Sequence, residues 1–320
     1  MSIIQLEPAF KDYIWGGTKL KEKYNKHTDL DIVAESWELS VHKDGASTVA
    51  SGEYKGLSFP EYLEKKGKQV LGTDCEKFDR FPILIKFIDA LQPLSIQVHP
   101  DNEYALRVEG EYGKTEMWYI LDCEPDSFLY FGVNREITKE EFRKRIEDNT
   151  LLEVLKAVPV HKGDVFFIKA GTIHAIGAGI QICEIQQNSN TTYRVYDFGR
   201  VGKDGKPREL HIDKAIDVSN LSPIESDFKA CGPESADDGS RTVKLASCEY
   251  FTTYETTVDT KTTIHVDQSS FVSIIVIEGE CTITNGDTVI QARKGDSIFA
   301  DAGSGDVTIE GKCQFIKTCE

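Results

Sequence analysis

The 320-residue sequence lacks the features by which membrane and disulfide-stabilised proteins are usually recognised. No uninterrupted apolar stretch approaches the roughly 18 residues that a membrane-spanning helix needs. The first residues, MSIIQLEPAFKDYIWGG, contain no basic segment leading into a long apolar run, so we expect no signal peptide. The eight cysteines include no Cys-x-x-Cys pair, which favours reduced thiols over a disulfide framework or a cysteine zinc site. Together these absences predict a soluble, cytoplasmic protein.

Positive charge is also scarce. Lys and Arg number 37 against 53 Asp and Glu, which gives a formal net charge of −16 at pH 7. A surface this acidic argues against nucleic acid or an anionic membrane as partner. It does not exclude a small anionic ligand, because a local cluster of Lys and Arg can outweigh distant charges that salt screens within about 8 Å.

Strand-like patterns dominate what the sequence does contain. Apolar or alternating runs bounded by Gly, Pro or Asp recur along the chain, and short strands with Gly-Asp and Asn-Gly turns fill residues 270–311. This density of turns is typical of a β-sandwich or barrel and predicts a mainly β fold. The clearest runs in the earlier part are FPILIKFIDA (81–90), EMWYILDC (116–123), DVFFIKA (164–170) and IQICEIQQ (180–187).

Helical periodicity is confined to two short segments. Residues 138–158 open with Thr138 and carry Glu141 three residues later, the signature of a capping box, and apolar residues follow. Residues 59–72 form a second candidate helix. We therefore expect a small helical insertion near 138–158 in an otherwise β chain.

A polar, charged passage at residues 226–240 is the best candidate for a linker between two β units. This division places a catalytic unit, with an N-terminal segment, in residues 1–225 and a second β unit, without metal ligands, in residues 240–320. Two segments, 161–176 and 293–309, share a Lys-Gly-Asp turn, a strand and a turn of small residues. Only the first has a histidine after the second turn, which suggests a duplication in which one copy kept a site.

Four residues of the first unit suggest a metal site. In SIQVHP (95–100), read as a strand, alternate side chains share a face, so Gln97 and His99 point to the same side. Glu116 and His174 each follow a glycine turn, at separations that let strands of a barrel converge on one point. Imidazole and carboxylate are ordinary zinc ligands, and an open site needs about three protein ligands plus water.

Each of these residues also has a purely structural interpretation. A single histidine is more often a hydrogen-bonded core or surface residue than a ligand, and a glutamate beside Lys114 is usually half of a solvated ion pair. Considered together, with their matching turn contexts, the four residues favour the metal site.

The same contexts carry a family resemblance. LSIQVHPD (94–101), GKTEMWYIL (113–121) and AGTIHAI (170–176) resemble the metal motif of the cupin superfamily and, within it, the type I phosphomannose isomerases. YIWGG (13–17) and YRVYDFGR (193–200) lie where that family has similar features. The resemblance covers nearly the whole chain, because several separate segments match in order.

The resemblance implies a fold and a reaction. The fold would be mainly β, with two cupin-type (jelly-roll) β-barrel units and the small helical insertion, as in the shorter bacterial form of the family. One Zn²⁺ per chain would be held by Gln97, His99, Glu116 and His174. The substrate would be a sugar phosphate, with interconversion of mannose 6-phosphate and fructose 6-phosphate through a cis-enediol.

Two cationic residues are candidates for catalysis. Arg194 follows a strand that begins soon after His174, so it can return to the rim of the same site, and the resemblance places the family's catalytic arginine here. The residues alone favour an ion pair of Arg194 with Asp197 or a neighbouring glutamate instead. Lys114 lies two residues before Glu116, on the same face, where it would move a proton or hold a sugar oxygen; otherwise it is a surface lysine.

The phosphate of the substrate needs hydrogen-bond donors. Ser95 lies on the ligand face of its strand and is one candidate. In the family a lysine six residues after the arginine helps to hold phosphate, and Arg200 occupies that place, where it would bind as a bidentate fork. Lys86 interrupts an apolar strand and is a further residue expected to face the pocket.

Two departures from the family pattern remove no ligand: Lys169 stands where proline usually precedes AGT, and Thr115 replaces the proline of KPE. Other functions remain open. One is another enzyme, either a different sugar-phosphate isomerase or an iron-dependent cupin dioxygenase, which would use two histidines and a carboxylate. The other is a non-catalytic sugar-phosphate-binding cupin, which would keep the barrel without the chemistry. Gln97 and the Arg194 segment favour the isomerase.

Overall fold

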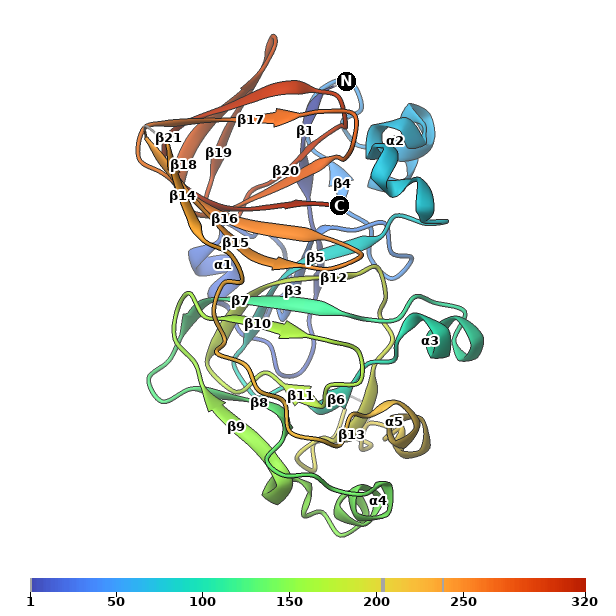
Figure 1. Cartoon of the computed structure of the whole chain (residues 1–320). Helices are drawn as coiled ribbons and strands as arrows, with labels where there is room; N and C mark the ends of the chain where they lie inside the picture. Colours follow the sequence, from blue (N-terminus) through green and yellow to red (C-terminus); the bar gives the residue numbers. More distant parts are fainter. Residues whose placement is uncertain (1, 203–204, 238) are drawn as a thin grey trace.

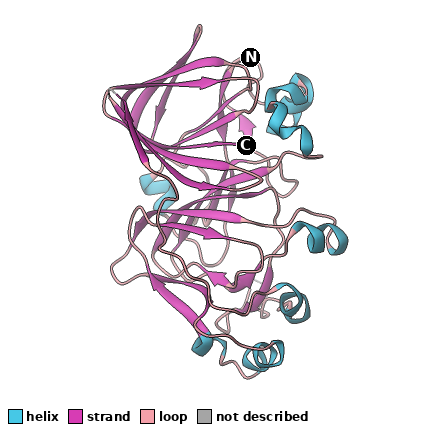
Figure 2. Cartoon of the chain, viewed as in Figure 1, coloured by secondary structure: helices cyan, strands magenta, loops and turns pink. Residues whose placement is uncertain are grey.

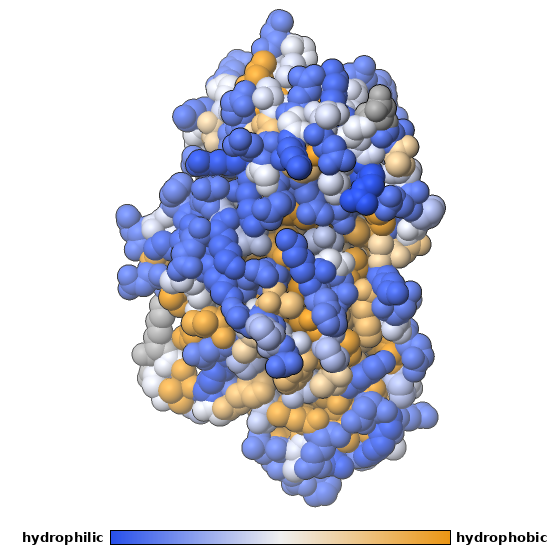
Figure 3. All heavy atoms as spheres, turned by 90° about the vertical axis from the view of Figure 1, so that its left-hand side faces the viewer, coloured by the Kyte–Doolittle hydropathy of each residue, from blue (hydrophilic) through white to orange (hydrophobic). Residues whose placement is uncertain are grey.

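The computed structural model describes residues 2–202, 205–237 and 239–320 and confirms a mainly β fold (Figures 1 and 2). The strands form three antiparallel sheets, and the short helices lie around their periphery. No helix among these residues is long and apolar enough to cross a membrane. Hydrophilic residues cover most of the face shown in Figure 3, with hydrophobic patches mainly in its lower half.

A six-stranded sheet occupies the middle of the molecule, in the order β10-β7-β12-β5-β3-β2. Its central strands are buried along their whole length because both faces are covered, which explains their nearly continuous apolar sequences. Its strands are β2 (Ala9–Lys11), β3 (Glu35–Leu39), β5 (Ile83–Ala90), β7 (Glu116–Cys123), β10 (Val165–Ile168) and β12 (Ile180–Gln187).

A five-stranded sheet, in the order β13-β6-β11-β8-β9, faces the six-stranded sheet and closes the first barrel (Figure 1). Residues of both sheets, among them Trp118, Phe131 and Ile182, pack into one buried cluster between them. Its strands are β6 (Ile96–Val98), β8 (Phe128–Val133), β9 (Leu155–Pro159), β11 (His174–Ala175) and β13 (Tyr193–Tyr196).

The C-terminal strands form the upper part of Figure 1, around the long strands β18 and β21. β1 pairs with β20 and β4 pairs with β1, so the start of the chain belongs to this sheet. The sheet contains β1 (Ile3–Glu7), β4 (Thr48–Val49), β14 (Glu234–Asp237), β15 (Ser240–Ser247), β16 (Thr252–Val258), β17 (Lys261–Val266), β18 (Val272–Asn285), β19 (Thr288–Arg293), β20 (Ser297–Ala300) and β21 (Gly305–Cys319).

The domain division near residues 226–240 stays a prediction. The sheet pairing shows that β1 and β4, from the start of the chain, belong to the same sheet as the C-terminal strands. Part of the expected linker is itself a strand, because residues 234–237 form β14 and pair with β15. The two Lys-Gly-Asp turns behave alike, since Gly163 and Gly295 both adopt positive φ and lead into β10 and β20.

The helices are short, and two differ from expectation. They are α1 (Lys19–Lys23), α2 (Phe59–Lys66), α3 (Asn102–Val108), α4 (Lys139–Glu147) and α5 (Ile212–Val218), with 3₁₀ turns at Lys68–Leu71, Thr73–Lys77 and Leu151–Val154. The helix expected over 59–72 ends at Gly67, whose positive φ of 81° stops it.

The helix expected over residues 138–158 is also shorter than predicted. Thr138 caps it by accepting a hydrogen bond from the backbone N–H of Glu141, and it ends at Glu147. Asn149 then takes a left-handed conformation with φ of 58°. The apolar residues from Leu155 on belong to β9, which pairs with β8, so tertiary pairing overrides their helical spacing.

An aromatic cluster joins the C-terminal sheet to the rest of the molecule. Phe299 lies 4.9 Å from Phe59 of α2 and 5.3 Å from Phe271, between ring centroids, and all three are fully buried.

We expect Phe299→Ala to lower the free energy of unfolding by about 3–5 kcal/mol, measured by urea denaturation. Phe128→Ala is the matched control, because Phe128 is 41% exposed. Equal losses in the two variants would contradict the account.

Candidate metal centre and active site

The polar groups of the first barrel come from both of its sheets. His174 in β11 pairs with Gln97 in β6, and Gln97 pairs with Arg194 in β13, so three of the expected residues are neighbours in one sheet. Glu116 begins β7 in the facing sheet. The alternation expected in SIQVHP is present. Ile96 and Val98 both pack into a hydrophobic cluster on one side of the strand, whereas Gln97, between them, lines the pocket.

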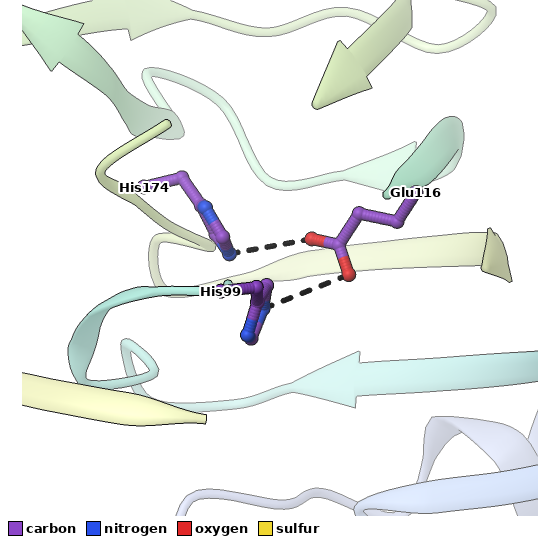
Figure 4. A group of neighbouring side chains, drawn as sticks. All are labelled: His99, Glu116 and His174. Carbon is purple, nitrogen blue, oxygen red and sulfur yellow. Dashed lines mark ion pairs between the residues drawn. The ribbon is translucent and has the colours of Figure 1, made fainter. Parts of the chain in front are cut away.

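His99, Glu116 and His174 form a buried group that could hold a metal ion (Figure 4). Their candidate ligand atoms all lie within 4.8 Å of one another. Glu116 Oε1 lies 3.2 Å from His174 Nε2, and Glu116 Oε2 lies 3.7 Å from His99 Nε2. Gln97 is adjacent, with its Nε2 3.5 Å from His174 Nε2.

The tautomer of both imidazoles follows from their backbone partners. His99 Nδ1 lies 2.9 Å from the carbonyl oxygen of Thr191, and His174 Nδ1 lies 2.9 Å from that of Thr172. A carbonyl only accepts, so Nδ1 carries the proton in each ring and Nε2 presents a lone pair. The lone pair of His174 faces Glu116, and that of His99 faces Lys114 Nζ at 3.2 Å, with Glu116 slightly farther away. This is the arrangement by which metal-binding histidines are oriented.

The electrostatics of this group favour a cation. Burial holds the pKa of His99 well below its usual value and lowers that of His174 to about 3, so both rings are neutral. Burial raises the pKa of Glu116 well above its usual value. Neither Glu116 oxygen has a hydrogen-bond partner among the described residues, although Lys114 Nζ forms an ion pair 2.7 Å from Oε2. The donor set therefore fits a divalent metal ion.

A row of buried charges leads away from Glu116 along the six-stranded sheet. Lys114 Nζ lies 3.6 Å from Glu184, and Lys86 Nζ lies 3.5 Å from both Glu184 and Glu35. Burial alone would raise the pKa of Glu184, but Lys114 and Lys86 lower it below its usual value. Burial alone would lower the pKa of Lys86, but Glu35 and Glu184 raise it above its usual value. Three carboxylates thus share two lysines, and when all three are ionised the row carries one negative charge more than its lysines balance, which a cation beside the neutral imidazoles would offset.

Sequence reasoning placed Lys86 toward the pocket but missed Glu184 and Glu35. Lys86 pairs directly with Glu184 across β5 and β12, and both line the pocket. The sequence did contain a signal for this pair, because Lys86 interrupts the mostly apolar run ILIKFIDA and Glu184 interrupts the mostly apolar run IQICEIQQ. Their pairing depends on sheet register, which the sequence does not reveal.

The pocket beside this group has a volume of about 270 Å³. Ser95, Lys114 and Arg194 line it, together with Arg208, which sequence reasoning missed because it lies in no motif. Arg194 Nε donates to Ser95 Oγ at 3.3 Å. The ion pair between Arg194 and Asp197 that the residues alone favoured is not among the described interactions.

Arg200 lies outside this lining. Its guanidinium donates to Asp197 and to the carbonyl oxygen of Pro93. Arg208 binds the same Asp197, with its Nε 2.7 Å from Oδ2. Asp197 thus connects Arg200 to an arginine that faces the pocket.

Comparisons with known proteins agree with this architecture. The family model described as "Phosphomannose isomerase type I, catalytic domain" matches residues 3–122, and "Mannose-6-phosphate isomerase, cupin domain" matches residues 241–320. The chain is 39% identical to Mannose-6-phosphate isomerase ManA of Bacillus subtilis over 97% of this chain and 96% of that protein. The chain belongs to the type I phosphomannose isomerase family.

Other relatives of this phosphomannose isomerase family member support the assignment. Mannose-6-phosphate isomerase of Streptococcus mutans is 37% identical over 92% of this chain and 90% of that protein. The crystal structure of the mannose 6-phosphate isomerase from Bacillus subtilis superposes with a TM-score of 0.93 at 34% identity, covering 99% of both chains. The fold therefore includes the cupin domains expected of the family.

Removing either imidazole tests the metal group. We expect His99→Ala and His174→Ala to lose metal binding by at least about 10-fold, because each removes a buried ligand that no neighbour replaces. Bound metal is measured by inductively coupled plasma mass spectrometry after dialysis against a weak chelator. The control is His161→Ala, whose side chain is 79% exposed. Full metal stoichiometry in His99→Ala would contradict the assignment.

Proposed function

We propose that this protein is a zinc-dependent aldose–ketose isomerase that interconverts mannose 6-phosphate and fructose 6-phosphate through a cis-enediol. The observation that carries the proposal is one pocket with two chemically different ends. A buried His/Glu/His group with excess negative charge lies at one end, and Arg194 and Arg208 face the same space. The proposed substrate, mannose 6-phosphate, is inferred from membership of the phosphomannose isomerase family.

The proposed zinc ligands are His99, Glu116 and His174, with Gln97 as a fourth. Nitrogen and oxygen donors of this kind suit zinc, and the open positions beside them would face substrate. When bound, zinc would supply a Lewis acid that stabilises negative charge on the sugar oxygens.

The protein's own residues then have separate tasks. Lys114, which lies between Glu116 and Glu184, is proposed to hold a sugar oxygen or to move the proton between neighbouring carbons. Arg194 is proposed to stabilise the negative charge that develops on the enediol, because it is a fixed cation in a half-enclosed pocket. Burial and the neighbouring Arg208 lower the pKa of Arg194, yet a guanidinium remains charged.

The phosphate is proposed to bind Ser95 and Arg208, beside the catalytic Arg194. Arginine forks match phosphate oxygens in a bidentate way, and two of them give the pocket a local positive charge within an acidic protein. Arg200, expected to bind phosphate from its place in the sequence, is proposed to act with them through Asp197, which it shares with Arg208. The thiols are free, which supports a reducing cytoplasmic setting.

Isomerisation by chelator-stripped protein tests the proposal directly. Conversion of mannose 6-phosphate to fructose 6-phosphate is measured with and without added zinc, in a coupled assay. We expect turnover to be lost on stripping and restored by about one equivalent of zinc. No turnover with zinc in folded protein, or oxygen uptake with iron instead, would reject the proposal in favour of the other cupin functions.

Arg208 gives a second test because it is predicted to act on binding more than on chemistry. Arg208→Ala should raise KM for mannose 6-phosphate by about 10–100-fold, the equivalent of one charged hydrogen bond of about 1.5–3 kcal/mol, with a smaller change in kcat. Arg208→Lys should recover part of the loss. Arg135→Ala, on an exposed residue near α4, is the control. An unchanged KM in Arg208→Ala would remove Arg208 from the phosphate site.

A further inference from the structure

Two side-chain amides, those of Asn102 and Gln187, join the chain segments that carry the polar groups of the pocket. Asn102 opens α3, three residues after His99, and Gln187 ends β12, three residues after Glu184. Gln187 is 1% exposed, and neither amide lines the pocket.

Both amides bind the segment that carries Lys114. The Gly113 N–H donates to Asn102 Oδ1 at 2.8 Å, and the Thr115 N–H donates to Gln187 Oε1 at 2.9 Å. Gln187 Nε2 donates to Asn102 Oδ1 at 2.9 Å and links the two side chains. Because a backbone N–H can only donate, the oxygens of both amides must face residues 113 and 115, which fixes the orientation of each amide.

The segments approach so closely that the linkage is rigid. A Cβ on Gly113 would lie 2.4 Å from the carbonyl carbon of Asp101, so only glycine fits there. The Lys114 N–H donates to the carbonyl oxygen of Pro100 at 2.9 Å. Lys114 is therefore held from both sides, at a fixed position relative to His99.

The last hydrogen bond of this group reaches the C-terminal sheet. Asn102 Nδ2 donates to the hydroxyl oxygen of Tyr250 at 3.1 Å. Tyr250 lies in the turn between β15 and β16, and this hydrogen bond brings that turn to the first residue of α3. The C-terminal β unit, in which the structure describes no group of metal ligands, thus forms a hydrogen bond with the segment that follows His99.

We propose that Asn102, Gln187 and Tyr250 are positioning residues that set where Lys114 and Glu116 stand relative to His99. Through Tyr250, the C-terminal unit takes part in the alignment of the active site. This inference rests on the proposed function, because it assigns these residues to the same metal centre and the same proton-handling lysine.

Two nearly isosteric substitutions separate hydrogen bonding from packing. In Asn102→Asp, one carboxylate oxygen still accepts from Gly113 and Gln187, and the other accepts from the Tyr250 hydroxyl, so every bond has a replacement. In Gln187→Glu, an oxygen replaces the amide nitrogen and faces Asn102 Oδ1, so that bond becomes a repulsion. A purely packing role predicts that both substitutions have the same effect.

The experiment first establishes zinc-dependent turnover in the unmodified protein; its absence there would reject the proposed function itself rather than this inference. Zinc affinity by competition with a chromogenic chelator, kcat, KM and the melting temperature are then compared. For Gln187→Glu we expect a loss of about 10–100-fold in zinc affinity or kcat, with KM for mannose 6-phosphate nearly unchanged. Asn102→Asp should remain within about threefold of the unmodified protein.

Tyr250→Phe tests the contribution of the C-terminal unit. It removes only a hydroxyl, so the result can be interpreted even if Gln187→Glu folds poorly. We expect kcat to fall several-fold at a nearly unchanged melting temperature, with Tyr254→Phe, in strand β16 of the same sheet, as the matched control. Equal values for Gln187→Glu and Asn102→Asp would overturn the positioning role of the amides. A Tyr250→Phe variant indistinguishable from Tyr254→Phe would overturn the role of the C-terminal unit.

Discussion

The buried charges of the six-stranded sheet constrain everything around them. Glu35, Lys86, Glu184, Lys114 and Glu116 alternate in sign along one wall of the barrel, where an unpaired charge would cost many kcal/mol. Each carboxylate has a lysine neighbour, but three carboxylates share two lysines, and the row ends at neutral imidazoles. A cation at that end completes the row, so the need to balance buried charge and the capacity to bind a metal have the same origin.

The fold supports this row by covering the six-stranded sheet on both faces. Its outer face packs against residues of the C-terminal sheet, among them Phe251, Phe299 and Ile316, and its inner face packs within the first barrel. The C-terminal unit therefore keeps water from the back of the charged wall, in addition to its contact through Tyr250.

Local patterns predicted much of this molecule, and long-range pairing explains what they missed. The strands, the metal-ligating group and the alternation in SIQVHP follow from spacing and motif. The pairing of β1 with β20, the Lys86–Glu184 contact and the place of Arg208 depend on sheet register and on contacts between distant segments. The helix expected over 138–158 is present but ends at Glu147, and pairing with β8 draws the last residues of that range into β9.

Anomalous diffraction would show whether one metal ion occupies the His/Glu/His group. Crystals of the zinc-loaded protein would be measured on both sides of the zinc absorption edge. The account predicts a single peak, about 2.0–2.2 Å from Nε2 of His99, Nε2 of His174 and a carboxylate oxygen of Glu116. Zinc bound elsewhere, with the Lys114 ammonium still paired to Glu116, would contradict it.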